Sequence, residues 1–281
     1  MCEFCIKHGE GKKWYLEAKN YSDDLLNDVR RYRFIEEFMS KADDLAKGAG
    51  ELDRIEKAPW FIRGIIKRVV SGREKKIHYG QVVPIEELEK IFKFVNAVVR
   101  VPCICRHVTL GQEKRYCYGI SIEPTGGRYF ELMRRLTDSY LYGPSNLGLE
   151  SLTPSQALSD IRGLEKEGLC HTIWSFHTPW IGAVCNCDRA DCLAMRATVT
   201  HTVPVMFRAE FVASVDREAC IGCRECMRMC QFGAIGYSAG TDRAVIDQSS
   251  CYGCGVCRSA CAQGAITLEE RSKVPVAANI W

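Results

Sequence analysis

The chain has 281 residues, which is long enough for a sizeable core and two domains. Hydrophobic residues make up 47% and charged residues 26% of it, a globular composition that excludes a disordered chain. The net charge of +3 is nearly neutral for this length, so we do not expect nucleic acid as the main partner.

The 17 cysteines are the most unusual feature of the composition. The first residues show neither the apolar core nor the cleavage site of a signal peptide. No stretch approaches the roughly 18 apolar residues of a transmembrane helix. We therefore expect a cytoplasmic protein without a transmembrane segment. In that reducing compartment, abundant cysteines in odd number indicate metal binding or catalysis.

The N-terminal region contains a C-x2-C pair, a predicted long helix and a basic segment. Cys2 and Cys5 either join other thiols in ligating a metal or are exposed thiols, because two thiolates alone cannot hold a cluster. Ser22 is predicted to cap a helix with one apolar stripe that ends at Gly48. Residues 54–76 contain eight Lys or Arg against two Glu. They predict either a helix that binds an anionic membrane or acidic partner, or an ordinary surface helix.

Two further helices are predicted in the middle of the chain. Pro84 begins the first, and apolar residues at steps of three and four continue it to Val98. Thr153 caps the second with Gln156 in a capping box, and Gly168 ends it. Together with the earlier long helix, these elements predict a mostly helical N-terminal and middle domain.

Six cysteines in the middle of the chain are candidate metal ligands. They form two C-x-C pairs and two single positions: Cys103 and Cys105, Cys185 and Cys187, Cys117, and Cys192. Buried free thiols, a structural zinc and an iron–sulfur site all stay open as interpretations. Arg106 either stabilises thiolates by charge-assisted hydrogen bonds or lies on the surface. His171 is either a ligand or proton donor, or a structural residue. No catalytic constellation and no nucleotide-binding motif is recognisable.

The C-terminal part contains an internal repeat at an offset of 31 residues. Each repeat has the spacing C-x2-C-x2-C-x3-C, which lets a tight loop wrap a cubic iron–sulfur cluster. Zinc sites usually use two separated C-x2-C pairs instead, so the spacing favours two iron–sulfur clusters. The cysteines are Cys220, Cys223, Cys226 and Cys230, followed by Cys251, Cys254, Cys257 and Cys261.

With these residues, the segment 210–271 resembles the bacterial two-[4Fe–4S] ferredoxins. The resemblance implies a pseudo-symmetric pair of β-hairpins with two short helices. The family usually has Pro after the last cysteine of each run, where this chain has Gln231 and Ala262. That departure adds a hydrogen-bond donor near a sulfur and removes no ligand. The resemblance also implies crossed ligation, with Cys220, Cys223, Cys226 and Cys261 on one cluster and Cys251, Cys254, Cys257 and Cys230 on the other.

The order of the remaining cysteines resembles ferredoxin-like iron–sulfur proteins of anaerobes. Those proteins have a C-x-C-R element, a later Cys and a C-N-C element before a two-cluster domain. Many of them carry a denser cysteine run after C-N-C, where this chain has Cys192 alone. Because iron–sulfur ligation is expected in the adjacent C-terminal segment, the resemblance favours an additional cluster over zinc in the middle region.

These observations lead to one expected architecture and one expected function. The fold is α+β: residues 1–209 form a helical, cysteine-rich domain, 210–271 the two-cluster domain and 272–281 a tail. The expected function is relay of low-potential electrons to or from a partner oxidoreductase. Three alternatives stay open: an electron-transfer subunit of a larger redox enzyme, an enzyme that uses the middle cluster, and a redox-sensing regulator that binds nucleic acid.

Overall fold

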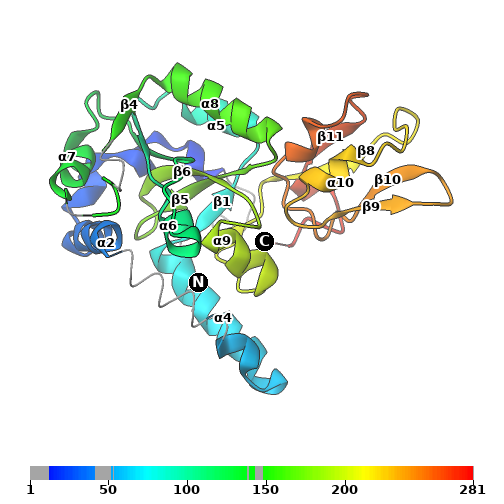
Figure 1. Cartoon of the computed structure of the whole chain (residues 1–281), viewed down its shortest axis with the longest axis horizontal. Helices are drawn as coiled ribbons and strands as arrows, with labels where there is room; N and C mark the ends of the chain where they lie inside the picture. Colours follow the sequence, from blue (N-terminus) through cyan, green and yellow to red (C-terminus); the bar gives the residue numbers. More distant parts are fainter. Residues whose placement is uncertain (1–12, 42–51, 53, 138, 143–147, 281) are drawn as a thin grey trace.

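The computed structural model describes residues 13–280 except 42–51, 53, 138 and 143–147 (Figure 1). A seven-stranded sheet with the order β4-β2-β3-β6-β5-β1-β7 is the centre of the first part of the chain. Neighbouring strands are antiparallel, except for the parallel pair β1 and β7. The strands are β1 (Gly80–Val82), β2 (Ala97–Val101), β3 (Cys117–Ser121), β4 (Glu150–Leu152), β5 (Cys170–Ser175), β6 (Ile181–Cys187) and β7 (Met206–Phe207).

Helices cover both faces of this sheet, so the first part has three layers. One face packs against three helices through a core that includes Ile35, Tyr129 and Met195: α2 (Val29–Ser40), α7 (Gly127–Arg135) and α9 (Leu193–Met195). The other face packs through Tyr15, Leu88 and other residues against α5 (Ile85–Ile91), α8 (Pro154–Lys166), η1 (Trp14–Leu16) and η2 (Ala18–Tyr21). Helix α6 (Ile104–Leu110) and the π-helical turn η4 (Arg196–Thr200) complete this part.

The capping box at the start of α8 is confirmed. The Thr153 hydroxyl accepts from the backbone N–H of Gln156 at 3.2 Å, and the Gln156 side chain accepts from the Thr153 N–H at 2.9 Å. Two orphan N–H groups of the first turn are thereby satisfied. At the other end of this segment Gly168 adopts a φ of +96°, as expected of a glycine that ends a helix.

Three sequence predictions need correction. The expectation of a mostly helical domain is wrong in omitting the sheet, and Val98 belongs to β2 and not to a continued α5. The helix that Ser22 caps is a short 3₁₀ turn, η3 (Asp23–Asn27), and Asp28 caps the α-helix α2 that follows. Gly48, the predicted end of that helix, lies outside the described residues.

The C-terminal part contains two two-stranded antiparallel sheets, which lie beside the larger sheet (Figure 1). They pair β8 (Phe211–Val215) with β11 (Ile266–Glu270) and β9 (Ile235–Ser238) with β10 (Arg243–Ile246). Helix α10 (Glu225–Met229) and the 3₁₀ turns η5 (Val256–Arg258) and η6 (Arg271–Lys273) complete it. Val274 and Ala277 belong to the predicted tail, and both are buried in the hydrophobic core of this C-terminal part.

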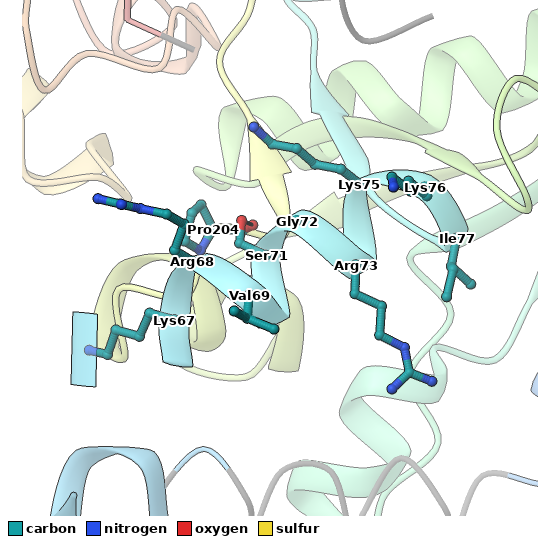
Figure 2. A pocket seen from close by; sticks show the side chains of 10 residues that line it. All are labelled: Lys67, Arg68, Val69, Ser71, Gly72, Arg73, Lys75, Lys76, Ile77 and Pro204. Atoms are coloured by element: carbon teal, nitrogen blue, oxygen red, sulfur yellow. Dashed lines mark hydrogen bonds between the residues drawn. The ribbon is translucent and has the colours of Figure 1, made fainter. Parts of the chain in front are cut away.

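Helix α4 (Trp60–Ile77) projects from the body of the molecule (Figure 1). It exposes apolar side chains, with Trp60 83% and Val69 66% exposed. Basic side chains border a groove along the helix, but Figure 2 shows Lys76, Arg68 and Arg73 leaving it in different directions. They therefore do not converge on one ligand. Within the described part of the chain, no helix has both the length and the apolar character needed to cross a membrane.

The two parts of the chain share a hydrophobic core. Cys254 and Val256 of the C-terminal part belong to the core cluster on the α2/α7/α9 face of the large sheet. At the surface, Arg258 makes a bidentate ion pair with Glu86 at the start of α5, with distances of 2.6 and 2.8 Å. These contacts hold one of the two cysteine loops against the first part of the chain.

Candidate iron–sulfur sites

The cysteine loops of the C-terminal part require glycine at matching positions of the two repeats. Gly222 and Gly253 both have a φ of +72°, in the left-handed region that favours glycine. A Cβ at Gly222 would lie 2.4 Å from the carbonyl oxygen of Asp242, and one at Gly253 would lie 1.9 Å from that of Phe211. The same backbone shape at the 31-residue offset therefore holds both loops close to a neighbouring strand or turn.

Backbone N–H groups donate hydrogen bonds to the cysteine sulfurs of both repeats. The N–H of Ala234 donates to Cys230 Sγ at 3.2 Å, and that of Ala265 donates to Cys261 Sγ at 3.3 Å. Cys251 Sγ likewise accepts from the N–H of Gly253 at 3.3 Å. Such donors stabilise thiolates, and hydrogen bonds to sulfur tune cluster potentials. Thiolate ligands with backbone donors are the donor set that an iron–sulfur cluster takes, so these residues fit the predicted group.

The fourth cysteine of each repeat lies near the first three of the other repeat. Burial raises the pKa of Cys226, and the charges of Cys223, Cys261 and Cys220 raise it further. Burial also raises the pKa of Cys257, with additional contributions from nearby cysteines, among them Cys254, Cys251 and Cys230. These charge interactions place Cys261 near the cysteines of the first run and Cys230 near those of the second run.

The six candidate cysteines of the middle region lie together; we call them the middle thiol site. Cys117 on β3 is directly opposite Cys185 on β6, and Cys187 follows on the same face because side chains of a strand alternate. Cys103 and Cys105 come from the start of α6, and Cys192 immediately precedes α9. Contact between α6 and α9 brings these three cysteines over the sheet.

Direct sulfur contacts connect these six residues in two groups of three. Cys103 Sγ and Cys117 Sγ are 3.3 Å apart, and Cys117 also hydrogen-bonds to Cys185. Hydrogen bonds from Cys105 and from Cys187 hold the pKa of Cys192 well below its usual value. Among the described residues, no three His, Cys, Asp or Glu side chains are arranged to hold a single metal ion, and this includes the C-terminal cysteines.

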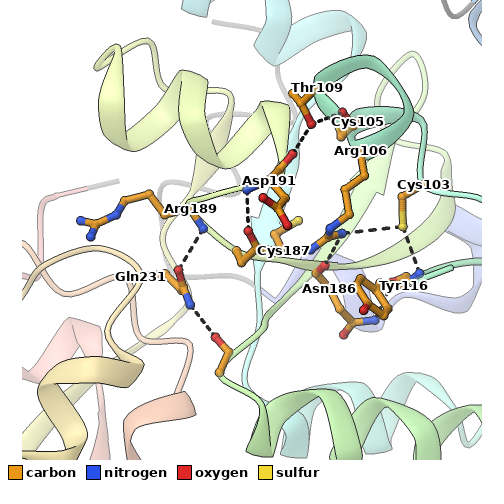
Figure 3. A network of polar contacts seen from close by, with 12 residues as sticks. Cys103, Cys105, Arg106, Thr109, Tyr116, Asn186, Cys187, Arg189, Asp191 and Gln231 are labelled. Atoms are coloured by element: carbon orange, nitrogen blue, oxygen red, sulfur yellow. Dashed lines mark hydrogen bonds and ion pairs between the residues drawn. The ribbon is translucent and has the colours of Figure 1, made fainter. Parts of the chain in front are cut away.

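Arg106 lies buried beside the middle thiol site (Figure 3). Its Nη1 is 3.7 Å from Cys103 Sγ and donates to the carbonyl oxygen of Asn186 at 3.1 Å, and its Nη2 pairs with Asp188. The guanidinium also covers the ring of Tyr116, with 4.6 Å to its centroid. Burial lowers the pKa of Arg106, but the charges of Cys103 and Asp188 raise it overall. The interpretation of Arg106 as a surface residue is therefore wrong.

Cys170 is a functional candidate that sequence reasoning missed. Its side chain is fully buried on the sheet, directly across from Cys187 in the register of β5 and β6. Burial and a hydrogen bond to Cys254 raise the pKa of Cys170, and the same hydrogen bond lowers that of Cys254. Cys192 of the middle thiol site also lies close enough to influence it. No spacing motif includes Cys170, so only the fold could reveal this link.

Gln231 connects the cysteine loops to the first part of the chain. Its Oε1 accepts from the backbone N–H of Arg189 at 2.9 Å, and its Nε2 donates to the carbonyl oxygen of Gly168 at 2.8 Å (Figure 3). Gln231 stands where the ferredoxins usually have Pro. The departure from the family pattern therefore supplies two hydrogen bonds between the two parts of this chain.

The remaining candidate residues, His171, Cys2 and Cys5, are not part of these sites. His171 points to the opposite face of β5 from Cys170, where its Nδ1 lies 2.6 Å from Asn186 Oδ1. Burial lowers the pKa of His171 to about 4, so it is a neutral residue near pH 7. Cys2 and Cys5 lie outside the described residues.

Together, the thiolate loops and their backbone donors define a ferredoxin-like iron–sulfur domain at the C-terminal end. A family model described as a 4Fe-4S dicluster domain matches residues 219–265. Domains of this class bind iron–sulfur clusters and transfer electrons through them. No curated protein and no solved structure matches the chain.

Proposed function

We propose that this protein relays low-potential electrons through two [4Fe–4S] clusters and a further centre at the middle thiol site. The burial of Cys170, Cys192 and Cys254 in one core cluster carries this proposal, because it brings the two cysteine-rich regions together through buried sulfur. Iron–sulfur clusters, when bound, change oxidation state by one electron each. The surrounding residues bury the centres, donate hydrogen bonds to sulfur and keep water away.

The last cysteine of each run lies near the other run, and we assign two sets of cluster ligands on this basis. The inner cluster is assigned to Cys251, Cys254, Cys257 and Cys230, and the outer cluster to Cys220, Cys223, Cys226 and Cys261. Cys251, Cys254 and Cys257 are buried, and Cys254 shares the core of the first part of the chain. In the outer set, Cys223 is exposed, and the neighbouring Ile221 is 60% exposed. This difference in exposure supports docking of the redox partner at the outer cluster.

The middle thiol site supports an iron–sulfur cluster better than a structural zinc. Iron–sulfur ligation is already indicated in the adjacent C-terminal part of the same chain, where the 4Fe-4S dicluster model matches. The buried Arg106 beside Cys103 would offset the negative charge of thiolates that ligate a cluster. The free thiols among the described residues also support a reducing compartment such as the cytoplasm.

Electron exchange with a protein acceptor tests the proposed direction. The reduced protein is mixed without oxygen with cytochrome c, which cannot enter the body of the chain. Cys226→Ala removes an outer-cluster ligand and is expected to slow cytochrome c reduction at least tenfold. Cys185→Ser, in the middle thiol site, is expected to leave the fast phase of this reaction unchanged. Equal rates in wild type and Cys226→Ala would contradict exit through the outer cluster.

A further inference from the structure

A cavity of about 340 Å³ lies between the thiol-bearing face of the large sheet and the helices that cover it. Most of the side chains around it are apolar or aromatic, including Phe38 on α2, Tyr129 on α7 and Trp174 on β5. Its volume lies in the range of small-molecule sites, which are mostly apolar with a few placed polar groups. The cavity extends beyond the thiols to residues with no proposed role in ligation, among them Phe38, His78 and Trp174.

The cavity is bordered on one side by the middle thiol site. Cys105, Cys117 and Cys185 line it and keep some accessible surface. Cys103, Cys187 and Cys192 are at most 2% exposed and do not line it. The site therefore presents three of its six residues to the cavity, and a molecule in the cavity would contact them.

His78 supplies a polar group on the cavity lining. Its Nδ1 lies 2.7 Å from the carbonyl oxygen of Ser175, which only accepts, so Nδ1 carries the proton. Its Nε2 has no hydrogen-bond partner among the residues that the structure describes. Burial lowers the pKa of His78 to about 4, so the ring is neutral near pH 7 and Nε2 is an acceptor.

Aromatic rings fix the orientation of this histidine. The centroids of Phe38, Phe176 and Trp174 lie 4.5, 4.7 and 4.8 Å from that of the His78 ring. Glu74 is the only acid among the described residues that line the cavity, and burial raises its pKa. A charged ligand would lose its hydration in such surroundings without gaining a partner charge of the right sign. The lining therefore favours a neutral, flat molecule.

We propose that this cavity binds a neutral, largely apolar small molecule of the phenol type, whose hydroxyl donates to His78 Nε2 while its ring lies toward the middle thiol site. The proposal goes beyond electron relay, because the binding requires the cavity and His78 and not a particular metal at the thiols. It gives the chain a small-molecule partner in contact with its middle thiol site.

Equilibrium dialysis of the full-length protein, purified without oxygen, tests the proposal with β-naphthol and its methyl ether. Wild type is expected to bind β-naphthol saturably and about fivefold more tightly than the ether, which cannot donate. In His78→Phe, which keeps an aromatic ring, the two probes are expected to bind equally. Ala183→Phe, which fills the cavity between Gly119 and Trp174, is expected to weaken both probes at least tenfold.

Ala239→Phe, in an exposed turn of the C-terminal part, is the matched control and is expected to change neither affinity. Iron and sulfide are measured in every variant, so that loss of a cluster is distinguished from loss of the binding site. The absence of saturable binding to wild type would overturn the proposal. That result is also the one expected if a cluster fills the cavity. Preference for β-naphthol that persists in His78→Phe would overturn it too.

Discussion

A thiol that is not a ligand can tune a cluster by hydrogen bonding. Cys170 is buried in the same core cluster as Cys254, and its thiol, which lies 3.7 Å from the carbonyl oxygen of His171, also interacts with Cys254 and lowers the pKa of Cys254. A reduced cluster carries one more negative charge than an oxidised one, so a donor to its ligand favours reduction. Among the cysteines of the first part, Cys170 is the one that interacts with Cys254, a proposed ligand of the inner cluster.

Cys170→Ala is therefore expected to make the potential of the inner cluster more negative by about 20–40 mV, which corresponds to one weak hydrogen bond. A redox titration followed by electron paramagnetic resonance measures the shift. Cys170→Ser retains a donor and is the matched control, for which a smaller shift is expected. An unchanged or more positive potential in the alanine variant would contradict this role.

Crossed ligation gives a prediction for the last cysteine of each run. Cys230→Ala is expected to disrupt the inner cluster and to spare the outer one, because Cys230 lies near Cys257 and the rest of the inner set. Cys261→Ala is the reciprocal variant. Mössbauer and paramagnetic resonance spectra that separate the clusters check both. Loss of the outer cluster in Cys230→Ala would show that each run ligates its own cluster.

At the scale of elements, the turn after Cys230 docks on the loop that follows β6 and on the turn between α8 and β5. Gln231→Ala removes two hydrogen bonds across this contact and is expected to lower the free energy of unfolding by about 1–2 kcal/mol. Denaturant unfolding without oxygen measures this change in the free energy of unfolding. Gln263→Ala, at an exposed position of the second repeat, is the control. An equal loss of stability in Gln263→Ala would contradict a specific role of Gln231 in joining the two parts.

The start of α6 depends on Arg106 in a comparable way. Arg106→Ala removes the cation that pairs with the half-buried Asp188 beside buried thiols, and the loss of one partner of such a pair costs about 1–3 kcal/mol. We expect lower stability and a lower metal content. Arg106→Lys keeps the positive charge but loses the planar guanidinium with its paired N–H donors. We therefore expect it to restore only part of the stability and part of the metal content. Wild-type metal content in Arg106→Ala would contradict a role at the middle thiol site.

Local signals in the sequence predicted some elements and not others. The capping box of α8 and the cysteine runs depend on short spacings, which is why they were predictable. The large sheet was missed because β5 is buried on both faces, so its residues show no alternation, and because β4 and β7 are very short. The convergence of Cys117 with Cys185 depends on strand pairing, which spacing alone does not encode.

At the scale of the whole molecule, sulfur-rich regions follow one another from the large sheet to the outer surface. The middle thiol site lies on the sheet, Cys170 shares a core cluster with Cys192 and Cys254, and the C-terminal loops include the exposed Cys223. A shared core fixes the junction between the two parts. This order supports a relay in which one end faces a buried cavity and the other faces a redox partner.

The content of iron, sulfide and zinc per chain, compared between wild type and the double variant Cys185→Ser/Cys187→Ser, tests this account most directly. Both proteins are purified as full-length chains without oxygen. We predict that the double variant loses the iron and sulfide of one cluster while the spectra of the inner and outer clusters persist. Unchanged iron and sulfide in the double variant, or loss of zinc in their place, would contradict an iron–sulfur centre at the middle thiol site.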